Sequence, residues 1–270
     1  MAELVVTVGA KVSLAPANGK HWRVRRGIFA KSGNLGLVYY SLSKDPMRFL
    51  RHLLACVVLT VSASGASAVE PKNGVDYVTL SAPQRAEAGK KIEVIEFFMY
   101  SCPHCNALEP LMTEWVKKQG DNIAFRRVHM PFSGPNDPQA HLYLTLEAMG
   151  KLDGMHEKIF HAIHDQRNRL NKDDAILDFV VKNGIDKAKY LAFSNSFAVQ
   201  TKMKRAAQLL TAYKLTSAPS IVIDGRYVTS PAQAGRPGQP ERASQQATLQ
   251  VMDALVAKAQ GAKAAAVAKK

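Results

Sequence analysis

The stretch that most constrains the fold is IEVIEFFMYSCPHCNALEP, residues 92–110. A near-continuous apolar run ends at a Cys-x-x-Cys pair, and a segment with helical character follows it. This order predicts a dithiol at the point where a buried strand passes into a helix. A thiolate at a helix N-terminus faces unpaired backbone N–H groups and the positive end of the helix dipole, so its pKa falls. Because the thiolate is the nucleophile of disulfide exchange, the stretch indicates thiol–disulfide chemistry.

The number of cysteines narrows the alternatives. The chain of 270 residues contains Cys56, Cys102 and Cys105, and Cys56 lies in a segment that we expect to be removed. Any disulfide inside the mature protein is then the functional one. The main alternative for a Cys-x-x-Cys pair is a structural zinc site, which normally needs two further Cys or His ligands at matching spacing. The sequence has no second cysteine pair, so we predict neither a metal nor a cofactor besides the redox-active dithiol.

The positive charge of the chain is spread unevenly. The formal net charge is +14, yet residues 1–68 carry nine Lys or Arg against two Asp or Glu, and residues 69–270 carry 27 against 20. The long remainder is therefore only mildly basic, with no dense basic cluster among aromatic residues. This distribution argues against nucleic-acid binding. Hydrophobic residues at 47% and charged residues at 21% are typical of a soluble globular protein.

Residues 47–68, MRFLRHLLACVVLTVSASGASA, have the pattern of a secretory signal peptide. Arg48 and Arg51 form a positive start, an apolar core follows, and Ala66-Ser67-Ala68 supplies a small-x-small cleavage site. The apolar core has only about half the length that a membrane-spanning helix requires. We therefore expect export and cleavage after Ala68.

A signal peptide should begin a chain, yet 46 residues precede Met47. They show no clear apolar periodicity and contain a basic run from His21 to Arg26. The simplest account is a start codon assigned too far upstream, with Met47 as the true first residue. If residues 1–46 are present, we expect them to be poorly ordered.

The remaining chain alternates between sheet and helix patterns. Apolar runs predict an edge strand at 75–80 and buried strands at 92–100 and 123–130, whereas residues 139–213 are helical throughout, with Asn171 as a candidate helix cap. Asp224-Gly225 between two apolar runs predicts a β-hairpin, and a closing helix follows at 241–259. The expected divisions are 1–46, an upstream extension; 47–68, the signal peptide; 69–137 and 214–260, two parts of one α/β domain; 138–213, an inserted all-helical subdomain; and 261–270, a flexible Ala/Lys tail.

The segment EFFMYSCPHC, the long helical block, the strand led by a proline and the DGRY hairpin resemble the DsbA-type thiol:disulfide oxidoreductases over residues 75–258. The resemblance implies a thioredoxin fold with a helical insertion, in the periplasm of a bacterium. The Pro-His dipeptide between the cysteines is typical of the oxidising members of this family.

The resemblance also implies roles for the residues of the CPHC motif. Cys102, nearer the helix start and the solvent, would attack and be attacked, and Cys105, one turn deeper, would be the resolving thiol. His104 can place a positive or hydrogen-bonding ring near the Cys102 sulfur. Pro103 suits the first helical turn, where its missing N–H costs nothing.

Three further residues enter through the same resemblance. Pro219 corresponds to the cis-proline beside the dithiol, which would expose the Ala218 backbone to pair with an extended substrate segment. The family usually has Val or Thr before this proline, so Ala218 leaves the substrate preference open. Glu96 corresponds to an acidic residue beneath the dithiol that would assist proton transfer with a raised pKa. A salt bridge at the sheet edge is the alternative interpretation of Glu96.

The implied activity is that of a monomeric oxidase, which donates the Cys102–Cys105 disulfide to unfolded or newly exported cysteine-containing proteins. An inner-membrane, quinone-linked partner of the DsbB type would reoxidise it. One alternative is a disulfide isomerase or reductase of the same fold, although residues 69–91 leave no room for the separate dimerisation domain usual in isomerases. A second alternative is a peptide-binding chaperone with an incidental dithiol.

Overall fold

The computed structural model describes residues 3–6, 10–17, 21–25 and 70–268. The chain divides into two compact units, Met1–Ala68 and Val69–Lys270. The predicted signal peptide, residues 47–68, lies outside the described residues.

The first unit contains a small antiparallel sheet in the order β1-β2-β3. Its strands are β1 (Glu3–Val6), β2 (Ala10–Ala17) and β3 (His21–Arg25). Regular structure in these segments differs from the expectation of a poorly ordered extension. The overlooked signal is a short period-two alternation, in which Val12 and Leu14 alternate with polar or small residues and Leu14 lies opposite Val24 in the sheet register.

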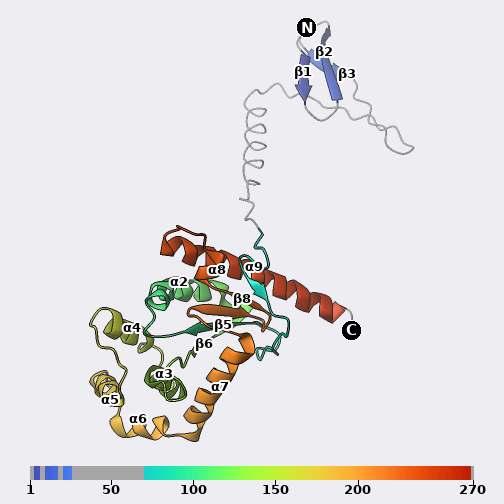
Figure 1. The fold of residues 1–270 in the computed structure, drawn as a ribbon. Helices are drawn as coiled ribbons and strands as arrows, with labels where there is room; N and C mark the ends of the chain where they lie inside the picture. The colour runs from blue at the N-terminus through green and yellow to red at the C-terminus, as the bar shows by residue number, and fades with distance from the viewer. Residues whose placement is uncertain (1–2, 7–9, 18–20, 26–69, 269–270) are drawn as a thin grey trace. The chain divides into compact units, whose positions relative to one another are not determined.

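The second unit is built on a five-stranded mixed sheet in the order β4-β8-β7-β5-β6 (Figure 1). The central strand β5 pairs in parallel with β6 and antiparallel with β7. The strands are β4 (Val78–Thr79), β5 (Ile92–Phe98), β6 (Ile123–His129), β7 (Ser220–Ile223) and β8 (Tyr227–Thr229). The expected edge strand at 75–80 is thus reduced to the two residues of β4.

The turn between β7 and β8 has the hairpin geometry predicted from Asp224-Gly225. Both residues have positive φ, 51° and 64°, as a two-residue turn of this type requires. The N–H of Arg226 donates to the carbonyl oxygen of Ile223 at 3.0 Å and closes the turn. A side chain at Gly225 would also clash with the Gln84 carbonyl oxygen, so glycine is needed on two grounds.

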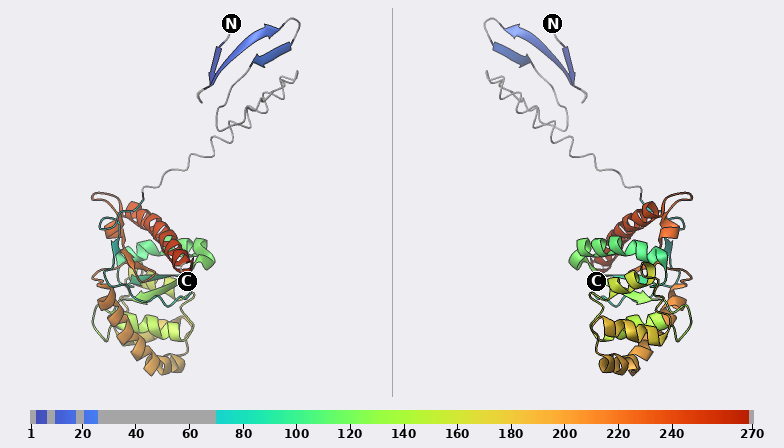
Figure 2. Two further views of the ribbon diagram at one scale, coloured as in Figure 1. Left: turned by 90° about the vertical axis from the view of Figure 1, so that its right-hand side faces the viewer. Right: turned by 90° about the vertical axis from the view of Figure 1, so that its left-hand side faces the viewer.

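Helices cover both faces of the sheet, which explains why every residue of β5 is buried. On one face lie α2 (Pro103–Gln119), which is followed by a 3-10 turn at Gly120–Asn122, and α9 (Glu241–Ala268) (Figures 1 and 2). Val94 packs there among residues of α2 and α9, while Ile95 and Phe97 point to the other face, against α7 (Phe197–Tyr213). Burial on both faces is the environment for which a continuous apolar run is suited.

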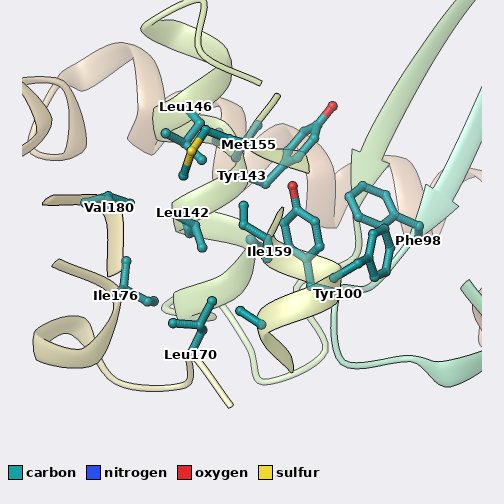
Figure 3. Close-up of a cluster of buried hydrophobic side chains, with 14 of the residues drawn as sticks. Phe98, Tyr100, Leu142, Tyr143, Leu146, Met155, Ile159, Leu170, Ile176 and Val180 are labelled. Carbon is teal, nitrogen blue, oxygen red and sulfur yellow. The ribbon is translucent and has the colours of Figure 1, made fainter. Parts of the chain in front are cut away.

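The insertion between β6 and β7 is helical over 138–213, and the structure describes no strand in these residues. Its helices are α3 (Pro138–Ala148), α4 (His156–His164), α5 (Asp173–Lys182), α6 (Lys187–Ser194) and α7. Figure 3 shows that Phe98 and Tyr100, at the end of β5, enter the core that these helices build. The insertion therefore packs around the residues that lead into the Cys-x-x-Cys motif. Its core includes Leu142, Leu146, Met155, Ile159, Leu170, Ile176 and Val180.

The C-terminal segment differs from the prediction of a flexible tail at 261–270, because α9 continues to Ala268. Alanine and lysine are strong helix formers, so the Ala/Lys composition prolongs the helix instead of fraying it. Lys263 also fastens this segment, since its Nζ lies 2.8 Å from the carbonyl oxygen of Lys91 and 2.9 Å from Oδ1 of Asp224.

One local prediction about a helix start also needs correction. The residue before α5 is Lys172, and no side chain caps this helix, so the predicted Asn171 cap is wrong. By contrast, Ser230 caps the short helix α8 (Pro231–Ala234) by accepting from the N–H of Gln233. Among the helices within the described ranges, none has the length and apolarity needed to cross a membrane.

Candidate active site

The dithiol lies where β5 passes into α2, as the sequence predicts. Cys102 is the N-cap of α2, with extended backbone angles, and its carbonyl oxygen accepts the N–H of Asn106 at 3.1 Å. Pro103 occupies the first helical position, where no intrahelical N–H bond is lost. Cys105 follows one turn later, and both cysteines are free thiols. The Cys102 sulfur therefore lies at the positive end of the helix dipole.

Side chains from three other elements hold the turn before Cys102. The Tyr100 N–H donates to Nε2 of His129 at 3.1 Å, and the Tyr100 carbonyl accepts from Nε2 of His164 at 2.8 Å. The Ser101 N–H donates to Oε1 of Gln139 at 3.2 Å. His129 ends β6, Gln139 lies in the first turn of α3 and His164 ends α4, so β6 and the helical insertion together fix the backbone that presents the dithiol. Sequence analysis missed these three residues, since nothing in their spacing relates them to Cys102.

The two cysteines differ in exposure. Cys102 exposes 7% of its surface and Cys105 only 1%. Cys102 is the more exposed of the two cysteines, as expected. It is nevertheless largely buried, whereas the sequence predicted a position nearer the solvent. Its neighbours Ser101, Pro103 and His104 are exposed, so access to the Cys102 sulfur is from the outer end of α2.

The two thiols also differ in charge. The pKa of Cys102 is lowered from 9.0 to about 6, first because the Cys105 thiol donates a hydrogen bond to its sulfur. The backbone N–H groups of Cys105 and His104 and the charge of His104 act in the same direction, and burial opposes them. The same hydrogen bond and burial raise the pKa of Cys105 far above its usual value. At neutral pH, Cys102 is therefore the thiolate and Cys105 the protonated thiol.

The loop before β7 faces the dithiol. The Ala218–Pro219 peptide bond is cis, as the resemblance implies. The carbonyl oxygen of Ala218 lies 3.5 Å from Sγ of Cys102, although 116 residues separate the two in sequence. The loop is closed by the Ser220 hydroxyl, which donates to the carbonyl oxygen of Ser217 at 2.7 Å. The structure thus brings Ala218 and Pro219 beside Cys102.

His104 extends from the exposed end of α2 towards the C-terminal helix. Its Nδ1 lies 2.7 Å from Oε1 of Glu241, the first residue of α9. This carboxylate raises the pKa of His104, and the Cys102 charge contributes in the same direction. Glu241 was not predicted, because 137 residues separate it from His104.

Glu96 is buried and also forms an ion pair, whereas its role in proton transfer stays a prediction. It is 1% exposed, on the face of β5 that α2 covers, and its Oε2 lies 2.9 Å from Nε of Arg127. Arg127 is directly opposite Glu96 in the parallel register of β5 and β6, the edge strand. Burial raises the pKa of Glu96 to about 7, although Arg127 acts against this. Glu96 in turn contributes to the raised pKa of Cys105, so the two groups are electrostatic neighbours.

Arg127 links Glu96 to a second carboxylate that sequence analysis missed. Nη2 of Arg127 lies 2.8 Å and 3.0 Å from the two carboxylate oxygens of Glu109. Glu109 also lies 3.4 Å from Nε2 of His156, and these residues line a cavity of about 660 Å³ that also contacts exposed Glu157. Glu109 follows Cys102 by seven residues, two turns along α2, which is a signal that could have placed it beneath the dithiol. The group connects the surroundings of Cys105 with the surface.

A second cavity, of about 510 Å³, lies beside the dithiol. Met99, Ser101 and Pro103 line it on one side, and Phe132 and Ile163 line it on the other. Phe132 exposes 52% of its surface, which is unusual for a large apolar side chain. The rest of the lining is largely polar and includes Asp137, His164 and Arg169, so the cavity has a mixed character and room for a single side chain. Met130, which follows β6, is fully buried.

Together these features define a class of protein. A sheet with helices on both faces carries a low-pKa thiolate at a helix start, with a buried partner thiol and a cis-proline loop beside it. These are the features that a thiol:disulfide oxidoreductase requires. Within the ranges that the structure describes, no group of three or more His, Cys, Asp or Glu side chains is arranged to hold a metal ion.

Comparisons with known proteins agree with this class. Residues 137–236 match the model of the DSBA-like thioredoxin domain. A thiol:disulfide interchange protein DsbA from Burkholderia cepacia is 38% identical over 218 residues, which cover 80% of this chain and 99% of that protein. The crystal structure of Pseudomonas aeruginosa DsbA matches with a TM-score of 0.66 and 35% identity, over 75% of this chain and 99% of that one. An oxidoreductase DsbA from Xylella fastidiosa matches with a TM-score of 0.63 and 26% identity, over 71% and 99% of the two chains.

The chain belongs to the DsbA family of thiol:disulfide interchange proteins. The predicted α/β class, a thioredoxin fold with an inserted helical block, is confirmed. The predicted activity, that of a thiol:disulfide oxidase, is confirmed as well.

Proposed function

We propose that this protein acts in the periplasm and donates the Cys102–Cys105 disulfide to newly exported proteins through a mixed disulfide at Cys102. The observation that carries the proposal is the unequal pair of sulfurs, one held as a thiolate at the head of α2 and the other as a buried thiol. Stabilising the Cys102 thiolate favours the dithiol form of the protein. The oxidised protein then readily transfers its disulfide to a substrate.

The proposed exchange has two steps. A substrate thiolate attacks Sγ of Cys102, the bond between the two protein sulfurs breaks, and Cys105 leaves and takes up a proton. A second substrate thiolate then attacks the substrate sulfur of the mixed disulfide, and Cys102 leaves as a thiolate. Two electrons pass from two substrate thiols to the protein dithiol. The low pKa of Cys102 supports the second step, because a thiolate of low pKa leaves faster.

Glu96 is proposed to assist the protonation of Cys105. A carboxyl group with a pKa of about 7 can hold a proton at neutral pH and release it to a neighbouring base. Its electrostatic effect on Cys105 supports the assignment. Arg127 bonds to both Glu96 and Glu109 and so holds Glu96 in place, while its guanidinium keeps its own protons throughout.

The substrate is proposed to bind as an extended segment along the cis-proline loop. The Ala218 carbonyl oxygen, 3.5 Å from the Cys102 sulfur, is placed to pair with the backbone of such a segment, in the manner of strand addition. The cavity between Met99 and Phe132 would hold a side chain next to the substrate cysteine. An unfolded, cysteine-containing chain meets both requirements.

The cellular setting is part of the proposal. The pattern of residues 47–68 supports export with cleavage after Ala68. Membership of the DsbA family supports reoxidation by an inner-membrane, quinone-linked partner of the DsbB type, and we propose that the protein works as a monomer.

Oxidised protein incubated with a reduced client, a scrambled client and a client without cysteines tests the activity. We expect rapid oxidation of the reduced client and little rearrangement of the scrambled one. Preferential repair of the scrambled client would favour an isomerase instead. If the Cys102→Ser variant aided the folding of the client without cysteines as well as wild type does, a chaperone would be favoured.

A further inference from the structure

We propose that Glu241, the first residue of the C-terminal helix, is a positioning residue that keeps His104 charged beside Cys102 and so makes the dithiol more oxidising. The inference rests on the proposed function and adds a residue outside the CPHC motif and the cis-proline loop. Glu241 does not touch the reacting sulfurs. It acts through His104.

His104 and Glu241 are in direct contact, and a third side chain, that of Gln245, holds the Glu241 carboxylate in place. Nδ1 of His104 lies 2.7 Å from Oε1 of Glu241, a distance typical of a charge-assisted hydrogen bond. The same oxygen accepts from Nε2 of Gln245 at 3.2 Å. Gln245 is only 3% exposed, so its side chain is fixed and holds the Glu241 carboxylate in turn.

The packing of α9 explains why Glu241 reaches the dithiol. Helix α9 lies along α2, and Oδ1 of Asp253 accepts from Nε1 of Trp115 at 2.8 Å and from Nε2 of Gln119 at 2.7 Å. These contacts are at the far end of α2, whereas Glu241 meets the head of α2. The two carboxylates of α9 thus fasten opposite ends of one helix. Glu241 is the acidic residue in the first turn of α9, where a negative charge interacts favourably with the dipole of its own helix.

The charge that reaches Cys102 comes from His104. Two groups act on the His104 charge, Glu241 from α9 and Cys102 from the head of its own helix. The Glu241 carboxylate raises the pKa of His104, so more of the ring is protonated in the pH range in which Cys102, with a pKa of about 6, ionises. The imidazolium then faces a thiolate in the dithiol form and no charge in the disulfide form. It therefore stabilises the dithiol selectively.

Replacing Glu241 with glutamine keeps the shape of the side chain and removes its charge. In Glu241→Gln, His104 loses its counter-ion and is more often neutral at pH 7, so the Cys102 thiolate loses support. We expect the pKa of Cys102 to rise. Because the pair is exposed, we expect the equilibrium with glutathione to shift towards the oxidised protein by roughly two- to fivefold.

The experiment compares wild type with Glu241→Gln, Asp253→Asn, His104→Ala and the double variant His104→Ala/Glu241→Gln, all as full chains. The pH dependence of Cys102 alkylation and the glutathione equilibrium are measured for each, and the His104 ring is titrated by NMR. Asp253→Asn is the matched control, because it removes the other carboxylate through which α9 holds α2. We expect it to leave both Cys102 measurements at their wild-type values. We expect Glu241→Asp to restore at least part of the wild-type values.

Three results would overturn the inference. They are wild-type values for Glu241→Gln, an equal shift in Asp253→Asn, and a Glu241→Gln effect that persists without His104. The second would show that loosened helix packing is the cause, and thermal unfolding of every variant would identify that case. An unshifted Cys102 thiol in wild type would instead refute the proposed function, and this inference with it.

Discussion

The head of α2 and the layer beneath it handle charge in opposite ways. At the head, His104 and Glu241 form a pair whose side chains are 65% and 46% exposed. Beneath it, the ion pair of Glu96 and Arg127 is only 1% and 20% exposed. Exposed pairs are screened by water and contribute little to stability, whereas breaking a buried pair leaves an uncompensated charge in the interior. The pair of His104 and Glu241 can therefore adjust the pKa of Cys102 with little effect on the stability of the fold. Changes to the pair of Glu96 and Arg127, by contrast, also change the stability of the fold.

The different roles of the Cys102 and Cys105 sulfurs are tested most directly by removing each sulfur in turn. We expect Cys102→Ser to abolish substrate oxidation, because the accessible nucleophile is lost. We expect Cys105→Ser to abolish turnover as well but to accumulate a mixed disulfide at Cys102, since the resolving thiol is absent. Non-reducing electrophoresis with a client that already carries a disulfide distinguishes the two, because the Cys102 thiolate attacks that disulfide, releases one client thiolate and keeps the other client sulfur in the mixed disulfide. A mixed disulfide trapped on Cys105 in the Cys102→Ser variant would reverse the assigned roles.

The buried layer is tested by Arg127→Met. This change leaves Glu96 and Glu109 without their shared cation, and we expect a loss of about 3–5 kcal/mol in the free energy of unfolding. Denaturant titration measures it. The control is Lys202→Met, which removes the cation of an exposed pair, because the side chains of Lys202 and its partner Glu147 are 46% and 34% exposed. Equal losses in the two variants would contradict the contrast between the layers.

The pH dependence of stability separates the two regions by sign. The pKa of Cys102 is lowered by folding from 9.0 to about 6, so its ionisation stabilises the dithiol form fully above pH 9. We expect this contribution to disappear as the pH falls from 9 to 6. The difference in free energy of unfolding between reduced wild type and Cys102→Ser, measured at each pH, should shrink over this range. A difference independent of pH would mean that the thiolate is not stabilised.

Ionisation of Glu96 should change the free energy of unfolding with pH in the opposite direction to ionisation of Cys102, and by a smaller amount. The pKa of Glu96 is raised from 4.5 to about 7, so the folded protein binds this proton more tightly than the unfolded chain does, and the resulting stabilisation is fully present below pH 4.5. We expect wild type to lose stability relative to Glu96→Gln as the pH rises from 4.5 to 7. The same denaturant titrations, done with the disulfide form to remove the effect of Cys102, measure this. A Glu96 that ionised with an ordinary pKa would give no slope above pH 5.

The sequence predicted correctly those elements whose determining residues are neighbours in the chain. The apolar run of β5, the Cys-x-x-Cys pair at the start of α2 and the Asp224-Gly225 turn are contiguous in sequence, and each has the expected structure. The helical insertion was visible as one unbroken pattern over 139–213.

The missed residues depend on contacts between distant segments. Arg127 is opposite Glu96 only through the parallel register of two strands that a helix separates. Glu241 meets His104 only because α9 returns along α2. The end of α9 was misjudged for a different reason, because low sequence complexity was equated with disorder although alanine and lysine favour helix.

The position of Cys102 has a consequence for timing. The residue exposes 7% of its surface and has the Ala218 carbonyl 3.5 Å from its sulfur. On the proposed function, this enclosure favours a cysteine on a loose polypeptide over one on a rigid, folded surface. Clients would then be oxidised only before they finish folding, so that slowly folding chains would be accessible for longer than fast ones.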